Sequence, residues 1–201
     1  MPAENTAWIL SISKEIMSVR NKKILRQSET ALLVIDIQER LLPAMNNPEE
    51  LKAGIIKLVR GFNILNLPVY YTEQYPKGLG NTVKELQEEL KSNAVEKLSF
   101  SCADAGNLFK ELIDKGITQV VVCGIESHVC VQQTVLDLLA GGFQVDVAAD
   151  GVSSRKVFDF ETALNRMRAN GAEITTTESI LFELLQVCGT DEFKAISKLV
   201  K

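Results

Sequence analysis

A cysteine, an aspartate and a lysine are the residues of this chain whose types and positions could support chemistry. Cys130 lies in VVVCGIESHVCVQQT, residues 120–134, where a run of β-branched residues breaks at Gly124 and an amphipathic helical pattern begins. The free N–H groups and the dipole of a helix start favour thiolate, so this placement predicts a lowered pKa for Cys130. The alternative is that Cys130 is a small buried hydrophobic residue, as free cysteines commonly are.

Asp36 and Lys97 also fall at the ends of predicted strands. Asp36 ends ALLVID, and Lys97 lies at the third strand, in VEKLSF. Taken singly, Asp36 could be a strand-end helix cap, and Lys97 could be an exposed lysine paired with Glu96. If the two converge on Cys130, the aspartate can accept the thiol proton, the lysine can stabilise negative charge on sulfur, and the sulfur can attack a carbonyl carbon.

The elements that must position these residues alternate between strand and helix patterns from Ala31 onward. A parallel pair of strands needs a crossover, and that crossover is usually a helix. The sequence therefore predicts an α/β fold, a three-layer αβα arrangement around a Rossmann-like six-stranded parallel sheet of order 3-2-1-4-5-6. The expected strands are residues 31–36, 68–72, 94–100, 119–124, 144–150 and 172–177. The expected helices are residues 48–66, 81–92, 104–116, 157–171 and 178–189, and one more that begins near Cys130.

Two parts are expected along the chain. Residues 1–30 form an N-terminal helical appendage, in which Trp8, Ile9, Ile12 and Ile16 make an apolar face. Residues 31–201 form one domain. The apolar face must cover the domain's own sheet or a neighbouring subunit, and the sequence leaves both open.

Composition and cysteine usage exclude several classes of function. The net charge is −4, without the basic patch that a phosphate backbone requires, so no nucleic-acid partner is expected. The four cysteines form no CxxC pair and the only histidine is His128, so we expect no metal, no cofactor and no disulfide framework. No apolar run reaches the length of a membrane span, and no secretory signal pattern is present, so no membrane partner and a reducing, cytoplasmic location are expected. An organelle-targeting role of the mildly basic N-terminal segment stays open.

The motifs ALLVID, TEQYPKGLG, GIESHVC and DGVSSR, together with Lys97, resemble the isochorismatase-like cysteine hydrolase superfamily. The resemblance covers residues 31–185 approximately, and the motifs look most like those of the small isochorismatase domain-containing proteins. It implies that residues 31–201 are an isochorismatase-like hydrolase domain. It also implies that Asp36, Lys97 and Cys130 are a catalytic triad.

The resemblance implies further site residues around the triad. A cis peptide bond would join Ile125 to Glu126, and the backbone N–H groups of Glu126 and Cys130 would form an oxyanion hole. Substrate contacts are expected from Gln38, Tyr75, Leu79 and His128. The loop after the second strand could instead only shape a tight turn, and His128 could be a solvent-facing or locally hydrogen-bonded histidine. Arg155 could bind a substrate carboxylate or tie its loop to a subunit partner.

The expected function is hydrolysis of a small amide, carbamoyl or imide-like molecule through a thioester on Cys130. Nicotinamidases of this superfamily hold a metal with an aspartate and two histidines, whereas this chain has only His128. The enzymatic alternative is vinyl ether hydrolysis of the isochorismatase type. The non-enzymatic alternative is an interaction domain or a thiol redox sensor. Many members of the superfamily are homo-oligomers, so the resemblance also implies a homo-oligomer.

Overall fold

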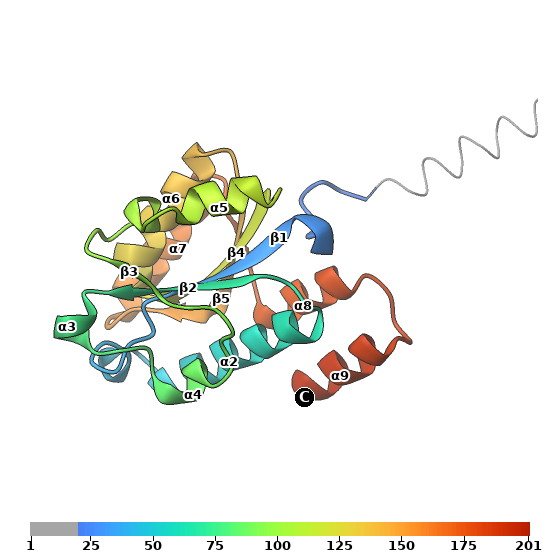
Figure 1. The fold of residues 1–201 in the computed structure, drawn as a ribbon, viewed down its shortest axis with the longest axis horizontal. Helices are drawn as coiled ribbons and strands as arrows, with labels where there is room; N and C mark the ends of the chain where they lie inside the picture. The colour runs from blue at the N-terminus through green and yellow to red at the C-terminus, as the bar shows by residue number, and fades with distance from the viewer. Residues whose placement is uncertain (1–19) are drawn as a thin grey trace, which may run out of the picture.

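The computed structural model describes residues 20–201, which form a parallel sheet between two layers of helices (Figure 1). Most of the predicted N-terminal appendage, including its apolar face, lies outside the described residues. Within residues 20–29 the only helical turn is a 3-10 turn, Gln27–Glu29. The first strand follows directly at Thr30.

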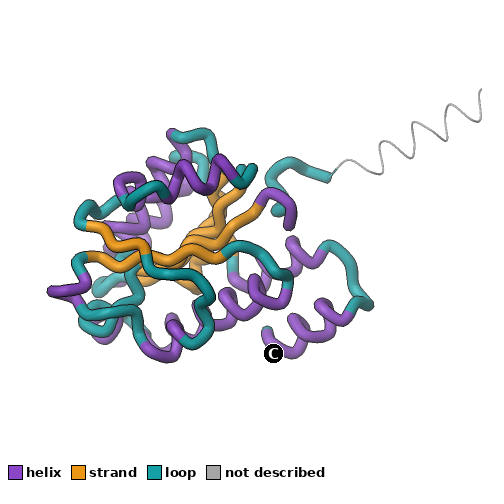
Figure 2. The backbone as a smooth tube through the Cα atoms, in the orientation of Figure 1, coloured by secondary structure: helices purple, strands orange, loops and turns teal. Residues whose placement is uncertain are grey.

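Six parallel strands form one sheet of order β3-β2-β1-β4-β5-β6 in the described part of the chain. Figure 2 shows the strands in orange, in the middle of the molecule between the helices. This sheet confirms the fold class and the strand order predicted from the sequence. The strands are Thr30–Ile35 (β1), Val69–Gln74 (β2), Val95–Lys97 (β3), Gln119–Ile125 (β4), Gln144–Ser153 (β5) and Glu173–Thr175 (β6). Because β1 pairs with both β2 and β4, the residues that follow β1 and β4 meet at the carboxyl edge of the sheet.

The helices divide between the two faces of the sheet (Figure 1). They are Pro48–Ile64 (α2), Pro76–Leu79 (α3), Lys84–Gln87 (α4), Leu108–Asp114 (α5), Gln132–Ala140 (α6), Val157–Ala169 (α7), Thr177–Leu185 (α8) and Asp191–Leu199 (α9). Helices α2, α8 and α9 cover one face, and α5, α6 and α7 cover the other. Alternate residues of β1 enter the two cores, with Leu32 in the first and Leu33 in the second. Burial on both faces explains why this strand reads as a continuous apolar run.

The crossover between β2 and β3 differs from its sequence prediction. A helix was expected over residues 81–92, and only Lys84–Gln87 is helical. The chain just before this turn is extended, because Gln38 and Thr82 form an isolated antiparallel bridge that attaches it to the segment after β1. This pairing leaves room for a single helical turn. A local amphipathic pattern does not reveal a pairing between residues so far apart in the sequence.

Candidate active site

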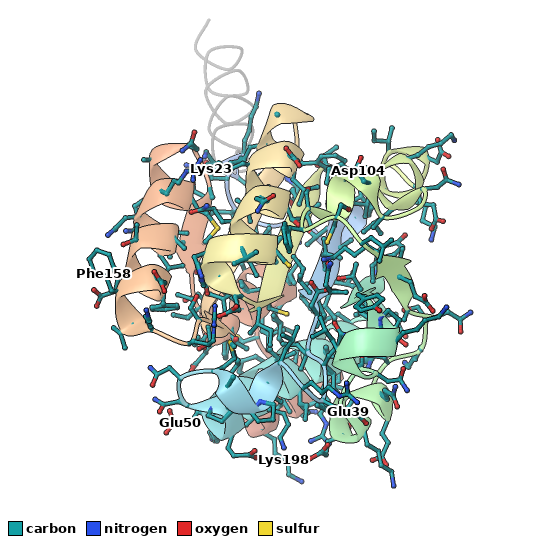
Figure 3. All side chains as sticks on the ribbon, turned by 90° about the vertical axis from the view of Figure 1, so that its left-hand side faces the viewer. Lys23, Glu39, Glu50, Asp104, Phe158 and Lys198 are labelled. Atoms are coloured by element: carbon teal, nitrogen blue, oxygen red, sulfur yellow. The ribbon has the colours of Figure 1, made fainter. Side chains whose placement is uncertain are left out.

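Asp36, Lys97 and Cys130 converge at the carboxyl edge of the sheet, which faces the viewer in Figure 3. Asp36 follows β1, Lys97 ends β3, and Cys130 lies in the helical turn that follows β4. The Nζ atom of Lys97 is 2.7 Å from Oδ2 of Asp36, and both side chains are fully buried. The Cys130 residue is 6% exposed, and the charges of Asp36 and Lys97 both act on its thiol. A thiol, a carboxylate and an ammonium therefore share one nearly closed site.

The carboxylate of Asp36 is held by Thr72 of the neighbouring strand. Asp36 adopts a left-handed backbone conformation with φ of 56°, which aspartate tolerates better than most residues. Its N–H donates to the carbonyl oxygen of Thr72 at 3.2 Å, and the hydroxyl of Thr72 donates to Oδ1 at 2.8 Å. The alternative that Asp36 is a strand-end helix cap is therefore wrong.

The ammonium group of Lys97 is surrounded by acceptors. Besides Asp36, it donates to Oε1 of Gln74 at 2.7 Å and to the carbonyl oxygens of Phe100 and Ser99 at 3.1 and 3.3 Å. The alternative of an exposed lysine is wrong. With its protons directed at these acceptors, Lys97 influences the sulfur through its charge rather than by donating to it.

A close approach of two strands shapes the turn that carries Cys130. Gly124 has φ of 128°, and a side chain there would place its Cβ 2.2 Å from the carbonyl oxygen of Ile35, so only glycine fits. The peptide bond between Ile125 and Glu126 is cis. A π-helical turn, Ser127–Val131, follows and runs into α6.

The turn that carries Cys130 is closed by hydrogen bonds to the backbone of Glu126. The carbonyl oxygen of Glu126 accepts from the N–H groups of Val129 and Val131, at 3.0 and 3.3 Å. The N–H of Glu126 makes no hydrogen bond to any other residue among residues 20–201. Cys130 is the fourth residue of the helical turn. The oxyanion hole named from the sequence, formed by the N–H groups of Glu126 and Cys130, stays a prediction.

The protonation of Cys130 differs from the prediction made from its helix start. Burial raises the pKa of the thiol above its usual range, and the charge and hydrogen bonding of Asp36 raise it further. The ammonium of Lys97 acts in the opposite direction without overcoming these effects. The predicted lowering is therefore wrong for the resting site, because desolvation and a neighbouring carboxylate outweigh the helix start. At neutral pH the proton stays on sulfur.

Gln38 binds the loop after β2 through its side chain. Its side chain is fully buried, and its Nε2 donates to the carbonyl oxygens of Gln74 and Gly80 at 3.0 and 2.6 Å. Its Oε1 accepts from the backbone N–H of Gln74 at 2.8 Å. Both ends of the amide are thus engaged, so Gln38 fixes the loop after β2, and its predicted substrate contact stays a prediction.

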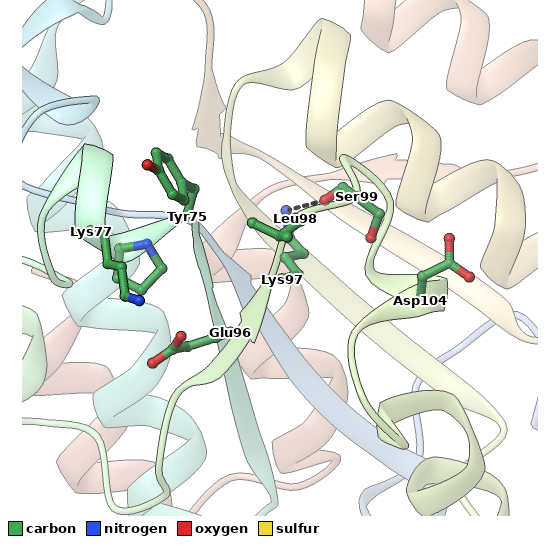
Figure 4. Close-up of a pocket in the computed structure, with 8 residues that line it drawn as sticks. Tyr75, Lys77, Glu96, Lys97, Leu98, Ser99 and Asp104 are labelled. Atoms are coloured by element: carbon green, nitrogen blue, oxygen red, sulfur yellow. Dashed lines mark hydrogen bonds between the residues drawn. The ribbon is translucent and has the colours of Figure 1, made fainter.

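A cavity of about 600 Å³ lies beside β3 at the carboxyl edge (Figure 4). Its lining residues come from the loops after β2 and β3: Tyr75, Pro76, Lys77, Glu96, Lys97, Leu98, Ser99 and Asp104. Tyr75 is 51% exposed and forms one wall with Lys77, while Ser99 and Asp104 lie on the opposite side. Leu79, the other loop residue expected to contact a substrate, is half-buried in α3 and does not line this cavity.

His128 and Arg155 contact neighbouring residues of their own chain. The Nδ1 atom of His128 lies 3.0 Å from Oγ of Ser154, and its Nε2 lies 4.0 Å from a carboxylate oxygen of Asp159. These contacts fit the locally hydrogen-bonded alternative, and a substrate contact stays a prediction. The guanidinium Nε of Arg155 donates to the Glu126 carboxylate at 2.9 Å, so Arg155 braces the turn before Cys130.

Two residues of the site, Thr72 and Gln74, were not identified from the sequence. Both lie in β2 and are buried, and they hydrogen-bond to Asp36 and Lys97 respectively. A signal was available: polar residues two positions apart in a strand share one face, and here they interrupt a buried segment. Among the described residues, no group of three or more His, Cys, Asp and Glu side chains could hold a metal ion.

Comparison with known proteins gives three relevant similarities. Isochorismatase domain-containing protein 1 of Salmo salar is 41% identical over 174 residues, which cover 86% of this chain and 61% of that protein. The chain therefore spans about three fifths of the length of this relative. The structure of MAR1 ribonuclease from Caenorhabditis elegans has a TM-score of 0.82 and 36% identity, covering 88% of this chain and 91% of that one.

A structure of YcaC from Pseudomonas aeruginosa with hexane-2,5-diol and covalent acrylamide has a TM-score of 0.82 at 26% identity. It covers 90% of this chain and 93% of that chain. The sequence model of the isochorismatase domain family matches residues 30–179 of this chain, which contain Asp36, Lys97 and Cys130. The chain belongs to the isochorismatase domain family.

Proposed function

We propose that this protein is a metal-independent cysteine hydrolase that cleaves a small amide, carbamoyl or imide-like substrate. The observation that carries this proposal is the buried ion pair of Asp36 and Lys97, whose charges act on the thiol of Cys130. A buried ion pair is expensive to desolvate and is weak evidence for stability. Its position beside a thiol at the carboxyl edge of the sheet favours a catalytic role.

In the first half-reaction, the proton of the Cys130 thiol moves to Asp36 as the sulfur attacks the carbonyl carbon. A carbon–sulfur bond forms, and the electron pair of the carbonyl double bond moves to oxygen. The N–H groups of Glu126 and Cys130 donate to this oxyanion, and in comparable sites the loss of one such donor costs about 3–4 kcal/mol. The tetrahedral intermediate collapses, the carbon–nitrogen bond breaks, and Asp36 returns the proton to the leaving ammonia or amine.

In the second half-reaction, water releases the acyl group from sulfur. The carboxylate of Asp36 accepts a proton from the water, and the water oxygen attacks the carbonyl carbon of the thioester. The carbon–sulfur bond then breaks, and the proton on Asp36 returns to the Cys130 sulfur. Lys97 keeps the carboxylate in place and stabilises negative charge on sulfur through both steps.

The cavity beside β3 supports a small substrate with a planar or apolar part. Tyr75 and Leu98 give it exposed apolar surface, and its charged lining residues other than Lys97 are Lys77, Glu96 and Asp104. Two acids and one base do not favour a phosphate backbone, so we do not extend to this chain the ribonuclease activity named for the C. elegans structure. The covalent acrylamide named for the YcaC structure is consistent with a nucleophilic side chain in a protein of this fold.

A panel of small amides, carbamoyl compounds and imides tests the proposal through ammonia or amine release. We expect turnover of at least one compound, and we expect Cys130→Ala to abolish it while Cys188→Ala, which changes an exposed cysteine, leaves it unchanged. No turnover of any compound at high enzyme concentration would contradict amide hydrolysis. Cleavage of a vinyl ether that persists in Cys130→Ala and is lost in Asp36→Ala would favour isochorismatase-type chemistry instead.

A further inference from the structure

The two oxygens of the Asp36 carboxylate are held by two different side chains. Oδ2 accepts from Lys97 at 2.7 Å, and Oδ1 accepts from the hydroxyl of Thr72 at 2.8 Å. We propose that Thr72 is a positioning residue for Asp36, which it keeps in the orientation that lets the carboxylate exchange a proton with Cys130. This role rests on the proposed function of Asp36 as the general acid and base.

Thr72 holds Asp36 by its main chain as well as by its side chain. Thr72 pairs with Ile35 in the ladder between β1 and β2, and its carbonyl oxygen accepts from the N–H of Asp36 at 3.2 Å. Asp36 has left the strand at this point and has a positive φ, so its backbone needs such an anchor. One residue thus fixes both where the aspartate leaves the sheet and which way its carboxylate turns.

The hydroxyl of Thr72 also contacts a second cysteine. A hydroxyl can donate or accept, and here it accepts from Sγ of Cys102 at 3.8 Å while it donates to Asp36. Burial raises the pKa of Cys102 to about 11, so this thiol keeps its proton at neutral pH and remains a donor. The chain of hydrogen bonds therefore runs in one direction, from Cys102 through Thr72 to Asp36.

The same chain continues to the helix that carries Cys130. The hydroxyl of Thr134 accepts from the N–H of Cys102 at 2.9 Å and donates to the carbonyl oxygen of Cys130 at 2.7 Å. Cys102 and Thr134 are fully buried. Asp36 and the backbone of Cys130 are therefore connected through Thr72, Cys102 and Thr134.

Orientation matters because a general base works only within hydrogen-bond reach of the proton that it takes. Without Thr72, the carboxylate of Asp36 keeps a single side-chain anchor at Lys97 and can turn about its last bond. The ordinary alternative is that Thr72 only satisfies a buried carboxylate and stabilises the fold. The two interpretations differ in what happens to turnover when the fold is intact.

The test compares Thr72→Val, which removes the hydroxyl at nearly constant volume, with Thr72→Ser, which keeps it. The assay uses the amide that the wild-type protein hydrolyses fastest. We expect Thr72→Val to lower kcat by about tenfold or more with little change in KM, and Thr72→Ser to restore most of the loss.

Thr177→Val is the matched control. The buried Thr177 also donates its hydroxyl to a carboxylate, that of Asp150 at 3.1 Å, so this variant loses an equivalent bond away from the site. It should lose stability in thermal unfolding and keep the wild-type kcat. If Thr72→Val keeps the wild-type kcat, or if Thr72→Ser loses as much as Thr72→Val, the positioning role is overturned.

Asp36→Asn, assayed in the same series, separates this inference from the proposed function. If Asp36→Asn abolishes turnover and Thr72→Val does not reduce it, only the role of Thr72 fails. If Asp36→Asn retains turnover, or if the wild-type protein hydrolyses no amide, the proposed function fails and the role of Thr72 fails with it.

Discussion

At the resting site the proton of Cys130 stays on sulfur, because burial and the charge of Asp36 both raise the pKa of the thiol. In the proposed mechanism, the nucleophile is generated when the substrate binds, by transfer of the thiol proton to Asp36. Desolvation is the largest of the causes that act on this pKa. Burial and neighbouring charges depend on tertiary packing, so a reading of local sequence around Cys130 does not predict them.

Asp36→Asn should therefore have opposite effects on two reactions. Removing the negative charge removes a cause of the raised pKa of Cys130, and Lys97 remains to favour thiolate. We expect alkylation of Cys130 by iodoacetamide at neutral pH to become faster by about tenfold or more, since each unit of pKa changes the thiolate fraction by about tenfold. Amide hydrolysis should be lost, because the acid and base are gone.

Peptide mass spectrometry can follow this alkylation at each cysteine separately. The exposed Cys188 serves as a reference within the same molecule, and its rate should be unchanged by the substitution. Slower alkylation of Cys130 in Asp36→Asn than in the wild-type protein would show that the carboxylate does not hold the thiol in its protonated form.

At the scale of elements, the sequence predicts the regular repeat of strands and helices and misses the contacts between loops. The order of the strands, and with it the meeting of the residues after β1 and β4, follows from buried strands that alternate with helices. The role of Gln38 does not follow, because it depends on the loop after β2 folding back onto the segment after β1. Thr72 and Gln74 were detectable as polar residues on one face of a buried strand.

The amino edge of the sheet contains a buried acid with a measurable effect on stability. Asp146 in β5 is 3% exposed, and burial raises its pKa to about 6, assisted by the charges of Glu183 and Glu173. Hydrogen bonding from Gln144 and the charge of Lys23 partly oppose this. The folded protein therefore binds more protons than the unfolded chain between about pH 4 and pH 6, so stability falls as the pH rises through that range.

Asp146→Asn should remove this loss, because a neutral amide keeps an acceptor for Gln144 without the charge. We expect a gain of about 1–3 kcal/mol in the free energy of unfolding at pH 7 and little difference from the wild-type protein at pH 4. Denaturant unfolding of both proteins at pH 7 and pH 4 measures this gain in the free energy of unfolding. Asp114→Asn, which changes an exposed surface pair, should shift stability little at either pH, and an equal gain in both variants would contradict the account.

At the scale of the whole molecule, several large apolar side chains are exposed in the segments that follow the carboxyl ends of β2, β3 and β5. Tyr75, Leu98, Phe100, Val157 and Phe158 are all at least half exposed there, and Phe158 projects outward from α7 (Figure 3). Such a surface supports the proposal of a homo-oligomer, which the sequence alone could not place on any face. Among the described residues, no helix is long and apolar enough to cross a membrane. A cytoplasmic location stays a prediction.

The central claim is that Cys130 carries the acyl group of the substrate, and trapping that intermediate tests it most directly. The protein is mixed with the amide panel, quenched in acid within a turnover and digested, and the masses of the four cysteine-containing sites are measured. The account predicts an adduct on Cys130 whose mass equals that of the substrate minus the leaving ammonia or amine, and no such adduct in Cys130→Ala. Amide turnover with the acyl group on another cysteine, or undiminished turnover in Cys130→Ala, would contradict it.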